Sequence, residues 1–423
     1  MSGGAPASEP GVGALSVDGG ALSLSSGLLA LLRPALDLLD PGGVLALLSD
    51  DASLRQDLPS WCRAERHGYL ALDATPTGRD VHRIARGRDG VPAGVREDGM
   101  RLVPEHGRFG ASEVLARVPF PERADPSTGF APRGARVEPG APAYPFRVVE
   151  RARAAPPEVA ALYDQAVTSQ WDAGRDVPWS TVVPLDPPLE RAVGQVMTFL
   201  AENELSALYV PSRFLPRIHP AYAETAMFLA TQLCDEARHI DVFLKRARAG
   251  GGGLGVSSAT TSRSLLTLLE LEDFTEASFL LSVLGEGTFL DLLRFVETHA
   301  PDEATKVLAS KARADEARHV KFGLAHVRHA LGHDDGLARR LEDAVRRRAA
   351  TLVGAGGVPP SIQDALTVLA AGATAPRAIA KGHDAFRALL ETMDENRVRR
   401  LVHAGFSEAH AKTLSDLHTP NFM

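Results

Sequence analysis

The pentapeptide Asp-Glu-Ala-Arg-His occurs twice in this chain of 423 residues, at positions 235–239 and 315–319. In each copy the glutamate and the histidine stand three residues apart, so on a helix both side chains leave the same face, about one turn apart. A carboxylate and an imidazole in this arrangement have the geometry of metal ligands. A single Glu-x-x-His is expected by chance in a chain with 14 histidines, whereas two copies inside identical pentapeptides are not.

The residues around the first copy place its two potential ligands on the apolar face of a helix. The stripe that recurs at helical spacing consists of Leu229, Leu233, Glu236, His239, Ile240 and Phe243. An unpaired charge on such a face is costly, which favours a bound metal. The alternative interpretation is two surface helices that carry Glu–Arg pairs.

Two further acids are expected, because bundles that bind two metal ions take Glu-x-x-His from two helices and one Glu from each of the others. Glu204 is in phase with apolar residues of its helix, whereas Glu202 is in phase with more polar ones, and Glu286 lies on a second apolar stripe. Glu204 precedes Glu236 by 32 residues and Glu286 precedes Glu316 by 30. Each interval suits a helical hairpin, and prolines mark both predicted turns.

Residues 190 to about 330 resemble the ferritin-like superfamily, and within it the di-iron carboxylate oxygenases and oxidases. The resemblance implies a mainly α fold built on a four-helix bundle that binds two iron ions, with manganese or a mixed Fe/Mn pair as alternatives, and that uses O2 as co-substrate. The metal ligands and catalytic residues that it implies are Glu204, Glu236, His239, Glu286, Glu316 and His319.

The resemblance also implies a layer of polar residues behind the ligands. In the monooxygenases the aspartate of each motif orients the histidine of the opposite motif, so Asp315 would orient His239 and Asp235 would orient His319. The full layer would consist of Asp235, Asp315, Arg238 and Arg318. For the two arginines, solvated salt bridges are the alternative.

Three departures from the known subfamilies narrow the resemblance. Phe243 stands where the ribonucleotide reductase small subunit has its radical-forming tyrosine, so stable radical storage is not expected. Leu290 replaces a threonine of the multicomponent hydroxylases, and Ala312 replaces a third histidine of some N-oxygenating relatives. His326 and His329 are expected in core or surface roles rather than as ligands.

The N-terminal part of the chain predicts a small two-layer α/β unit, because strands and helices alternate there. The expected strands are Ala21–Leu24, Val44–Leu48, Tyr69–Leu72 and Val81–Ala85, and the expected helices are Gly27–Leu39 and Leu54–Glu65. The stretches Asp40–Asp51 and Asp57–Cys62 resemble the TusA (SirA-like) sulfur-carrier fold. The catalytic cysteine of that family is lacking, because Ser25 occupies its position. Cys62 is interpreted as a buried structural thiol.

The domain organisation follows from these segments and from the dense Gly and Pro residues between them. We expect the C-terminal helices either to cover the bundle or to form a homodimer surface. The predicted parts are a disordered tail (1–13), the TusA-like α/β domain (14–86), a Gly/Pro-rich linker or wrap (87–145), the di-iron bundle (146–345) and a C-terminal helical extension (346–423).

The composition predicts a cytoplasmic protein. A net charge of −7, from 46 basic and 53 acidic residues, offers no electrostatic surface for nucleic acid or anionic membranes. Two cysteines cannot form a disulfide framework, which favours a reducing compartment. No apolar stretch reaches the roughly 18 residues of a membrane-spanning helix.

Taken with the motifs, the resemblance implies an enzyme, a non-haem di-iron oxidoreductase that activates O2. Such an oxidase or oxygenase would act on a small organic substrate by hydroxylation, N-oxygenation or desaturation, with electrons from a donor protein such as a ferredoxin or a reductase. The alternatives are an iron-handling protein with ferroxidase or peroxide-scavenging activity, and a metal-stabilised binding scaffold. The length of the chain and its extra domain favour the enzyme.

The first testable prediction is that the N-terminal unit does not transfer sulfur, because the Ser25 hydroxyl is a poor acceptor of persulfide sulfur. After incubation with a desulfurase and labelled cysteine, the unit should remain unlabelled. Stable labelling that disappears in a Cys62→Ser variant would instead identify Cys62 as the acceptor.

Overall fold

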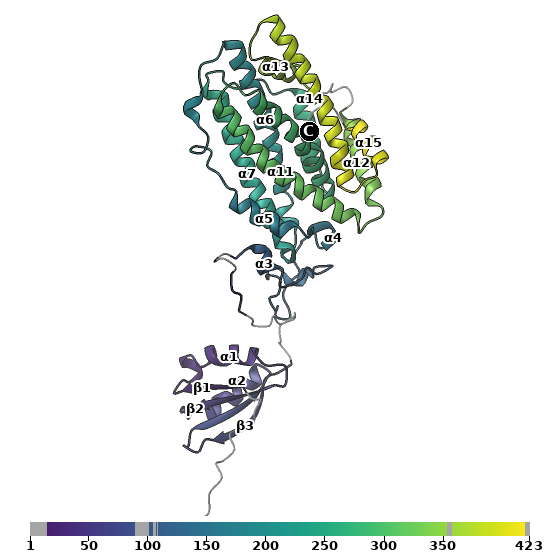
Figure 1. Cartoon of the computed structure of the whole chain (residues 1–423). Helices are drawn as coiled ribbons and strands as arrows, with labels where there is room; N and C mark the ends of the chain where they lie inside the picture. The colour runs from purple at the N-terminus through teal and green to yellow at the C-terminus, as the bar shows by residue number, and fades with distance from the viewer. Residues whose placement is uncertain (1–14, 89–100, 105–106, 108, 353–357, 419–423) are drawn as a thin grey trace, which may run out of the picture. The chain divides into compact units, whose positions relative to one another are not determined.

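A computed structural model describes residues 15–88, 101–104, 107, 109–352 and 358–418 (Figure 1). The predicted disordered tail lies outside these residues. By its internal contacts the chain divides into an α/β unit, residues 1–96 with 134–142, and a helical unit, residues 97–133 with 143–423. Within the described ranges, no helix has the length and apolar character needed to cross a membrane.

The described part of the α/β unit contains a four-stranded sheet with the strand order β1-β2-β4-β3. β1 pairs in parallel with β2, and the other neighbours are antiparallel. Its elements are β1 (Leu15–Gly20), α1 (Leu29–Asp37), β2 (Val44–Ser49), α2 (Leu54–Ala64), β3 (Gly68–Ala74) and β4 (Asp80–Ala85). Both helices share one apolar core with alternate residues of the strands, which makes the unit two-layered.

The sequence prediction for the first strand of this unit was wrong. The strand is Leu15–Gly20, and residues 21–23 form a turn that leads into a short 3-10 helix at Leu24–Ser26. Gly20 has a φ of 51°, which ends the extended strand. Leu22 and Leu24 still pack against the core, but from the turn rather than from a strand.

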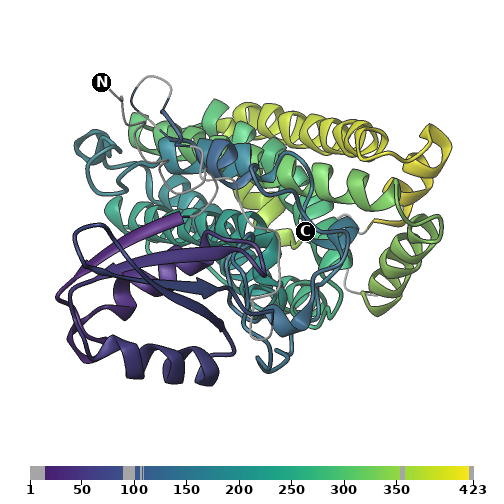
Figure 2. The ribbon, with the colours of Figure 1, turned by 90° about the horizontal axis from the view of Figure 1, so that it is seen from below.

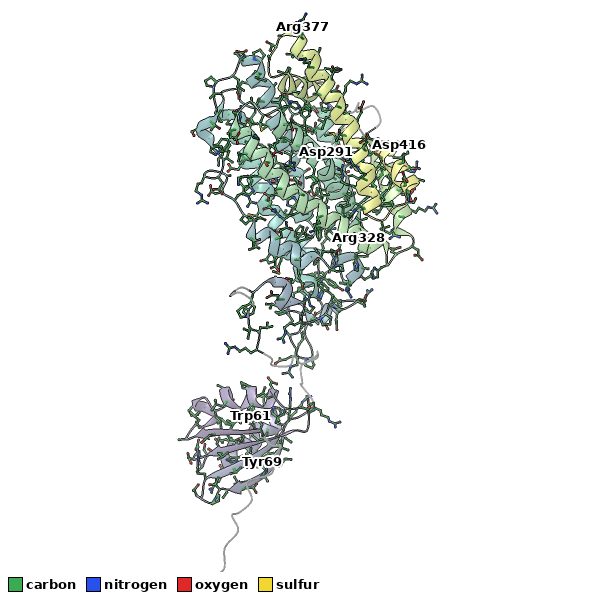
Figure 3. All side chains as sticks on the ribbon, in the orientation of Figure 1. Trp61, Tyr69, Asp291, Arg328, Arg377 and Asp416 are labelled. Carbon is green, nitrogen blue, oxygen red and sulfur yellow. The ribbon has the colours of Figure 1, made fainter. Side chains whose placement is uncertain are left out.

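Cys62 and its aromatic neighbours lie at the core of the α/β unit. Burial raises the pKa of the Cys62 thiol to about 11, so the thiol stays protonated at neutral pH. Trp61 and Tyr69 (Figure 3) pack against the same core, and the Tyr69 hydroxyl lies 2.9 Å from Nδ1 of the buried His82. The resemblance of this unit to the sulfur-carrier fold remains a prediction.

The helical unit is a ferritin-like four-helix bundle, so the predicted fold class, a mainly helical chain with a small N-terminal sheet domain, is confirmed (Figure 1). The two hairpins of the bundle are formed by α6 (Pro187–Ser212) with α7 (Ala223–Ala249), and by α9 (Phe274–Ser278), η7 (Phe279–Glu286) and α10 (Gly287–Thr298) with α11 (Glu303–Leu331). Pro187 opens α6, and Asp302 caps α11 by accepting a hydrogen bond of 2.7 Å from the Thr305 N–H.

The third helical stretch of the bundle contains a π-helix, η7, that the sequence did not predict. All eight of its residues are buried, and it ends at Glu286, one of the expected metal ligands. α11 approaches it closely at Gly323, where an added Cβ would lie 2.7 Å from Cβ of Ser282. A glycine is therefore needed for this packing. Wider π turns of this kind occur frequently at functional sites.

Part of the predicted linker or wrap lies on the bundle. Arg133 forms a buried ion pair with Glu224 at the start of α7, and its Nη1 donates a hydrogen bond of 2.6 Å to the Ala221 carbonyl. The elements that lead up to α6 are α3 (Ala111–Leu115), η3 (Pro126–Thr128), α4 (Arg151–Ala154), α5 (Val159–Thr168) and η4 (Trp179–Thr181).

The helices beyond the bundle cover it. Apart from α8 (Ala259–Leu269), which follows α7, they are α12 (Leu337–Thr351), α13 (Pro360–Ala371), α14 (Pro376–His403) and α15 (Glu408–Leu417). α14 runs along the bundle (Figure 2), and its buried Phe386 and Met393 join the bundle core. Asp291 of α10 (Figure 3) accepts hydrogen bonds from Asn396 at 2.5 Å and Arg400 at 3.3 Å. These contacts favour the covering role.

His326 on α11 is fully buried between the rings of Phe274 and Phe322, whose centroids lie 4.9 and 5.9 Å away. Its Nε2 lies 3.1 Å from Oγ1 of Thr275. Burial lowers the pKa of His326 to about 3, so the imidazole is neutral in the folded protein at neutral pH.

The second prediction is that His326 makes the fold sensitive to acid. Below about pH 6.5 the unfolded chain binds a proton here that the folded chain does not bind until about pH 3, so the free energy of unfolding falls as the pH falls through this window. His326→Gln should make this slope shallower by up to about 1.4 kcal/mol per pH unit, measured by urea unfolding. The control is His403→Gln at an exposed position, and equal slopes in wild type and His326→Gln would contradict the prediction.

Candidate metal centre

The bundle brings all six sequence-predicted ligands together in its interior. None of these side chains is more than 2% exposed. They come from α6 (Glu204), α7 (Glu236 and His239), the end of η7 (Glu286) and α11 (Glu316 and His319). Helical spacing explains the arrangement, since each motif presents its Glu and His from the same face of one helix.

The ligand atoms form two overlapping groups, each of which could hold one metal ion. The first consists of Glu204, Glu236, His239 and Glu316, and the second of Glu236, Glu286, Glu316 and His319, with the ligand atoms of each group within 4.8 Å of one another. Both groups contain three carboxylates and one imidazole. The two motif glutamates belong to both groups, so they are placed to bridge two ions, while Glu204 and Glu286 each belong to one.

Both histidines direct Nδ1 toward the shared carboxylates. Nδ1 of His239 lies 3.1 Å from Glu236 and 3.2 Å from Glu316, and Nδ1 of His319 lies 3.1 Å from Glu236 and 3.5 Å from Glu316. Near-equal distances from both histidines give the centre an approximate two-fold arrangement. This arrangement follows from the repeated pentapeptide.

The carboxylates fit a cationic group, because several of their buried oxygens accept no hydrogen bond. Among the described residues, the ligand atoms buried without a hydrogen bond are Oε1 of Glu204, Oε1 of Glu236, Oε2 of Glu286, both oxygens of Glu316, and Nδ1 of His319. Leaving a polar atom buried and unsatisfied costs about 1–3 kcal/mol, and more when it is charged. Metal ions coordinated to these atoms would remove that cost.

Without a bound metal ion, protons on the glutamates and histidines compensate the negative charge of the cluster. Burial, with repulsion from Glu316, raises the pKa of Glu204 and of Glu286 well above the usual range of a carboxyl group. Burial disfavours imidazolium, but the surrounding carboxylates outweigh it and raise the pKa of His239 and His319. Binding of metal ions must therefore displace protons from the cluster.

Behind the ligands, two hydrogen bonds cross between α7 and α11. Nε2 of His239 lies 3.2 Å from Oδ2 of Asp315, and Nε2 of His319 lies 3.2 Å from Oδ2 of Asp235. Each aspartate thus holds the Nε2–H of the opposite histidine, which directs Nδ1 at the centre, where its lone pair becomes free when the imidazole loses its second proton.

The two motif arginines join this polar layer. Arg318 donates hydrogen bonds of 3.0 Å to Asp235 and 2.5 Å to Asp315, and Arg238 also pairs with both aspartates. The arginine side chains are only 5% and 13% exposed, so solvated salt bridges do not describe them. The indole N–H of Trp171 donates a further hydrogen bond of 2.7 Å to Asp315. Burial raises the pKa of Asp315, but its bonds to His239 and Trp171 outweigh burial and lower it.

Three residues of the site were missed at the level of sequence. Gln232 donates a hydrogen bond of 2.9 Å from Nε2 to Oε1 of Glu286, and the nearby Ser282 hydroxyl opposes the rise in the pKa of Glu286. Both residues stand four positions before a ligand on the same helical face, and that spacing was a usable signal. Trp171 offered no such signal, because it bonds to a residue 144 positions away.

The remaining sequence interpretations concern residues outside the cluster. Glu202 points away from it and accepts a hydrogen bond from Ser257. His326 bonds Thr275, and neither His326 nor His329 belongs to either ligand group. Phe243 is fully buried, with its ring centroid 6.4 Å from that of His239.

Fold and site together define a ferritin-like bundle with a carboxylate–histidine centre able to hold two metal ions. No protein-family profile matches the sequence, and no curated protein matches it. Among solved structures, a variant of an R2-like ligand-binding oxidase with an aerobically reconstituted Fe/Fe cofactor is similar, with 17% identity, a TM-score of 0.46, and coverage of 59% of this chain and 93% of that chain.

Two further R2-like ligand-binding oxidase structures are similar at the same level. A variant with an aerobically reconstituted Mn/Fe cofactor has 17% identity, a TM-score of 0.42 and coverage of 59% of this chain and 93% of that chain. An oxidase with an aerobically reconstituted metal cofactor after photoconversion has 15% identity, a TM-score of 0.40 and coverage of 62% and 93%. Likenesses this distant assign no activity, so the function of the chain is inferred from its own residues.

The third prediction is that the protein binds two metal ions per chain through the predicted ligands. Protein loaded anaerobically with Fe(II) and desalted should retain two equivalents. Glu236→Ala should lose most of both because Glu236 belongs to both ligand groups, and His319→Ala should lose at least one. Glu202→Ala, on the same helix as Glu204 but outside the cluster, is the matched control. Unchanged metal content in both ligand variants would overturn the assignment.

Proposed function

We propose that this protein is a non-haem oxidoreductase that holds two iron ions, activates O2 and oxidises a small organic substrate. The observation that carries the proposal is the fully buried set of four glutamates and two histidines, arranged as two groups that share two carboxylates. Ligands of oxygen and imidazole nitrogen suit iron and manganese, so a manganese or mixed pair is the alternative. When bound and reduced, the metals would supply the electrons that activate O2.

In this proposal Glu236 and Glu316 would contribute to both metal positions, because each stands in both ligand groups. Glu204 and His239 complete one position, and Glu286 and His319 complete the other. The protein contributes to the reaction by positioning these groups and by excluding water from them. Burial of the whole cluster serves both tasks.

The aspartates and arginines behind the cluster hold the histidines in place. Asp315 fixes the Nε2–H of His239, and Asp235 fixes that of His319, so both imidazoles would bind a metal ion through Nδ1 as neutral ligands. The guanidinium groups of Arg238 and Arg318 balance the charge of the two aspartates. We further propose that an electron-donor protein, such as a ferredoxin or a reductase, supplies electrons for each turnover.

Iron storage is the principal alternative, and retention of the metal separates the two functions. A storage protein must pass its oxidised iron onward, whereas an oxidoreductase keeps the same two ions through each cycle. The six protein ligands, the closed polar layer and the burial of the cluster favour retention.

The fourth prediction is that the reduced, iron-loaded protein reacts with O2 in a single stoichiometric burst. It should hold about two iron ions per chain after excess Fe(II) and air, measured by metal analysis after desalting. Because the Phe243 ring carries no hydroxyl, electron paramagnetic resonance should detect no lasting tyrosyl signal at this position. Continued oxidation of excess Fe(II), with iron accumulating beyond two per chain, would favour storage instead.

A further inference from the structure

Three consecutive arginines stand in the last turns of α12, and each has a different environment. The exposed Arg346 pairs with Glu342 of the same helix at 2.5 Å, and the exposed Arg347 pairs with Glu276 at 3.1 Å. Arg348, in contrast, is only 6% exposed. A buried guanidinium normally has a carboxylate partner, because an uncompensated buried charge is costly. The partners of Arg348 are therefore informative.

Hydroxyl groups of α8 hold the Arg348 side chain. Its Nε donates a hydrogen bond of 2.9 Å to Oγ1 of Thr267, and its Nη2 donates one of 2.7 Å to Oγ of Ser264. In the part of the chain that the structure describes, no carboxylate forms an ion pair with Arg348. Burial lowers the pKa of Arg348 to about 10, so the group is still protonated at neutral pH. A guanidinium has five N–H donors, so most of its donors and its full charge remain available.

The carbonyl groups at the ends of α8 and α12 do not supply the missing acceptors. The last carbonyls of a helix carry partial negative charge and can accept hydrogen bonds from an arginine. Here the N–H of Leu352 donates to the carbonyls of Arg348 and Ala349, and the N–H of Glu270 donates to the carbonyl of Leu266. Among the described residues, only the two hydroxyl groups of α8 accept from the guanidinium.

Arg348 lines a cavity of about 150 Å³ between α8 and α12. Leu271 and Leu280 contribute apolar wall, and Arg347 and Glu270 contribute charge. The volume is about ten times the space that one water molecule needs, but it is below the roughly 300 Å³ at which sites for drug-sized ligands begin. None of the six predicted metal ligands lines this cavity, so it is separate from the metal centre. The space suits a small ligand.

Glu270 is the one acid among the residues that line this cavity. It is exposed at the end of α8 and, within the described residues, forms no ion pair with Arg347 or Arg348. Water solvates an exposed carboxylate, so its effect on a nearby charge is small. Since Glu276 already balances Arg347, the positive charge of Arg348 is the one that a ligand would satisfy.

We propose that this cavity binds a small anion of the phosphate class, either inorganic phosphate or the phosphate group of a small phosphomonoester. The unused N–H groups of the Arg348 guanidinium donate to the phosphate oxygens, since its planar fork matches phosphate geometry. A phosphate group suits the site better than a carboxylate does, because it carries a charge of about −1.5 to −2 at neutral pH and three strong acceptor oxygens. The site is independent of the proposed oxidoreductase function.

The fifth prediction tests this site by isothermal titration calorimetry of the full-length protein with inorganic phosphate at constant ionic strength. Wild type should bind phosphate with a Kd of about 1 mM or below. Arg348→Met keeps the apolar stem of the side chain and should weaken binding about tenfold or more, because the charge-assisted hydrogen bonds are lost. Glu270→Gln should strengthen binding about twofold to fivefold, because it removes a repulsive charge. Phosphate bound at the metal centre would respond to neither substitution.

The matched control is Arg346→Gln, which removes an exposed arginine of the same run that lies outside the cavity and should leave the affinity unchanged. Absence of phosphate binding to wild type up to about 10 mM overturns the proposal, and so does equal affinity of wild type and Arg348→Met. Thermal unfolding checks that Arg348→Met is folded. If it is not, Glu270→Gln decides alone, and an unchanged or weaker affinity of that variant overturns the proposal.

Two further probes, methyl phosphate and acetate, identify the class of anion. Acetate should bind more weakly than inorganic phosphate, and tighter binding of acetate overturns the assignment to phosphate. Tighter binding of methyl phosphate than of inorganic phosphate assigns the site to a phosphomonoester, and the reverse order assigns it to the free ion. Both of these orders support a phosphate site.

Discussion

The helical unit depends on the compensation of negative charge at the centre of its bundle. Four glutamates from four helical stretches meet with almost no exposure to solvent, and an uncompensated carboxylate there would destabilise the fold. Protons on the two motif histidines supply the first compensation, and metal ions in place of those protons would supply more. Each helix of the bundle contributes at least one charged group to this point, so the packing of the helices and the charge at the centre depend on one another.

Around the cluster, side chains are arranged in successive layers, and the residues of each layer form hydrogen bonds to the residues of the layer inside it. The aspartates hold the histidines, and the arginines and Trp171 hold the aspartates. A separate buried ion network ties α6, α7 and α11, where Arg246 binds Glu190 at 2.7 Å and Asp302 at 2.8 Å. Breaking a buried ion pair typically costs about 3–5 kcal/mol. The Arg246 network and the layer of aspartates and arginines therefore both restrict movement of the helices relative to one another.

A part of the fold could be predicted from the sequence when its interactions join residues that are close together in the chain. The motif ligands are related by i, i+3 spacing on one helix, so the sequence showed their common face. The whole first strand was misplaced, because apolar residues at Leu22 and Leu24 fit a strand and a packed turn equally well. The π-helix before Glu286 was missed, because a change of helical hydrogen bonding leaves the apolar stripe nearly unaltered.

The sequence by itself predicted which six residues meet in the interior of the bundle, the pairing of its helices into two hairpins, and the mainly helical class. These features depend on local periodicity and on a repeated motif. Only the tertiary structure decided that Trp171 and Gln232 support the centre, and that Arg348 is buried against hydroxyl groups of α8 beside a cavity. The reason is physical: such contacts join side chains from segments distant in the chain, and their geometry exists only once the helices have packed.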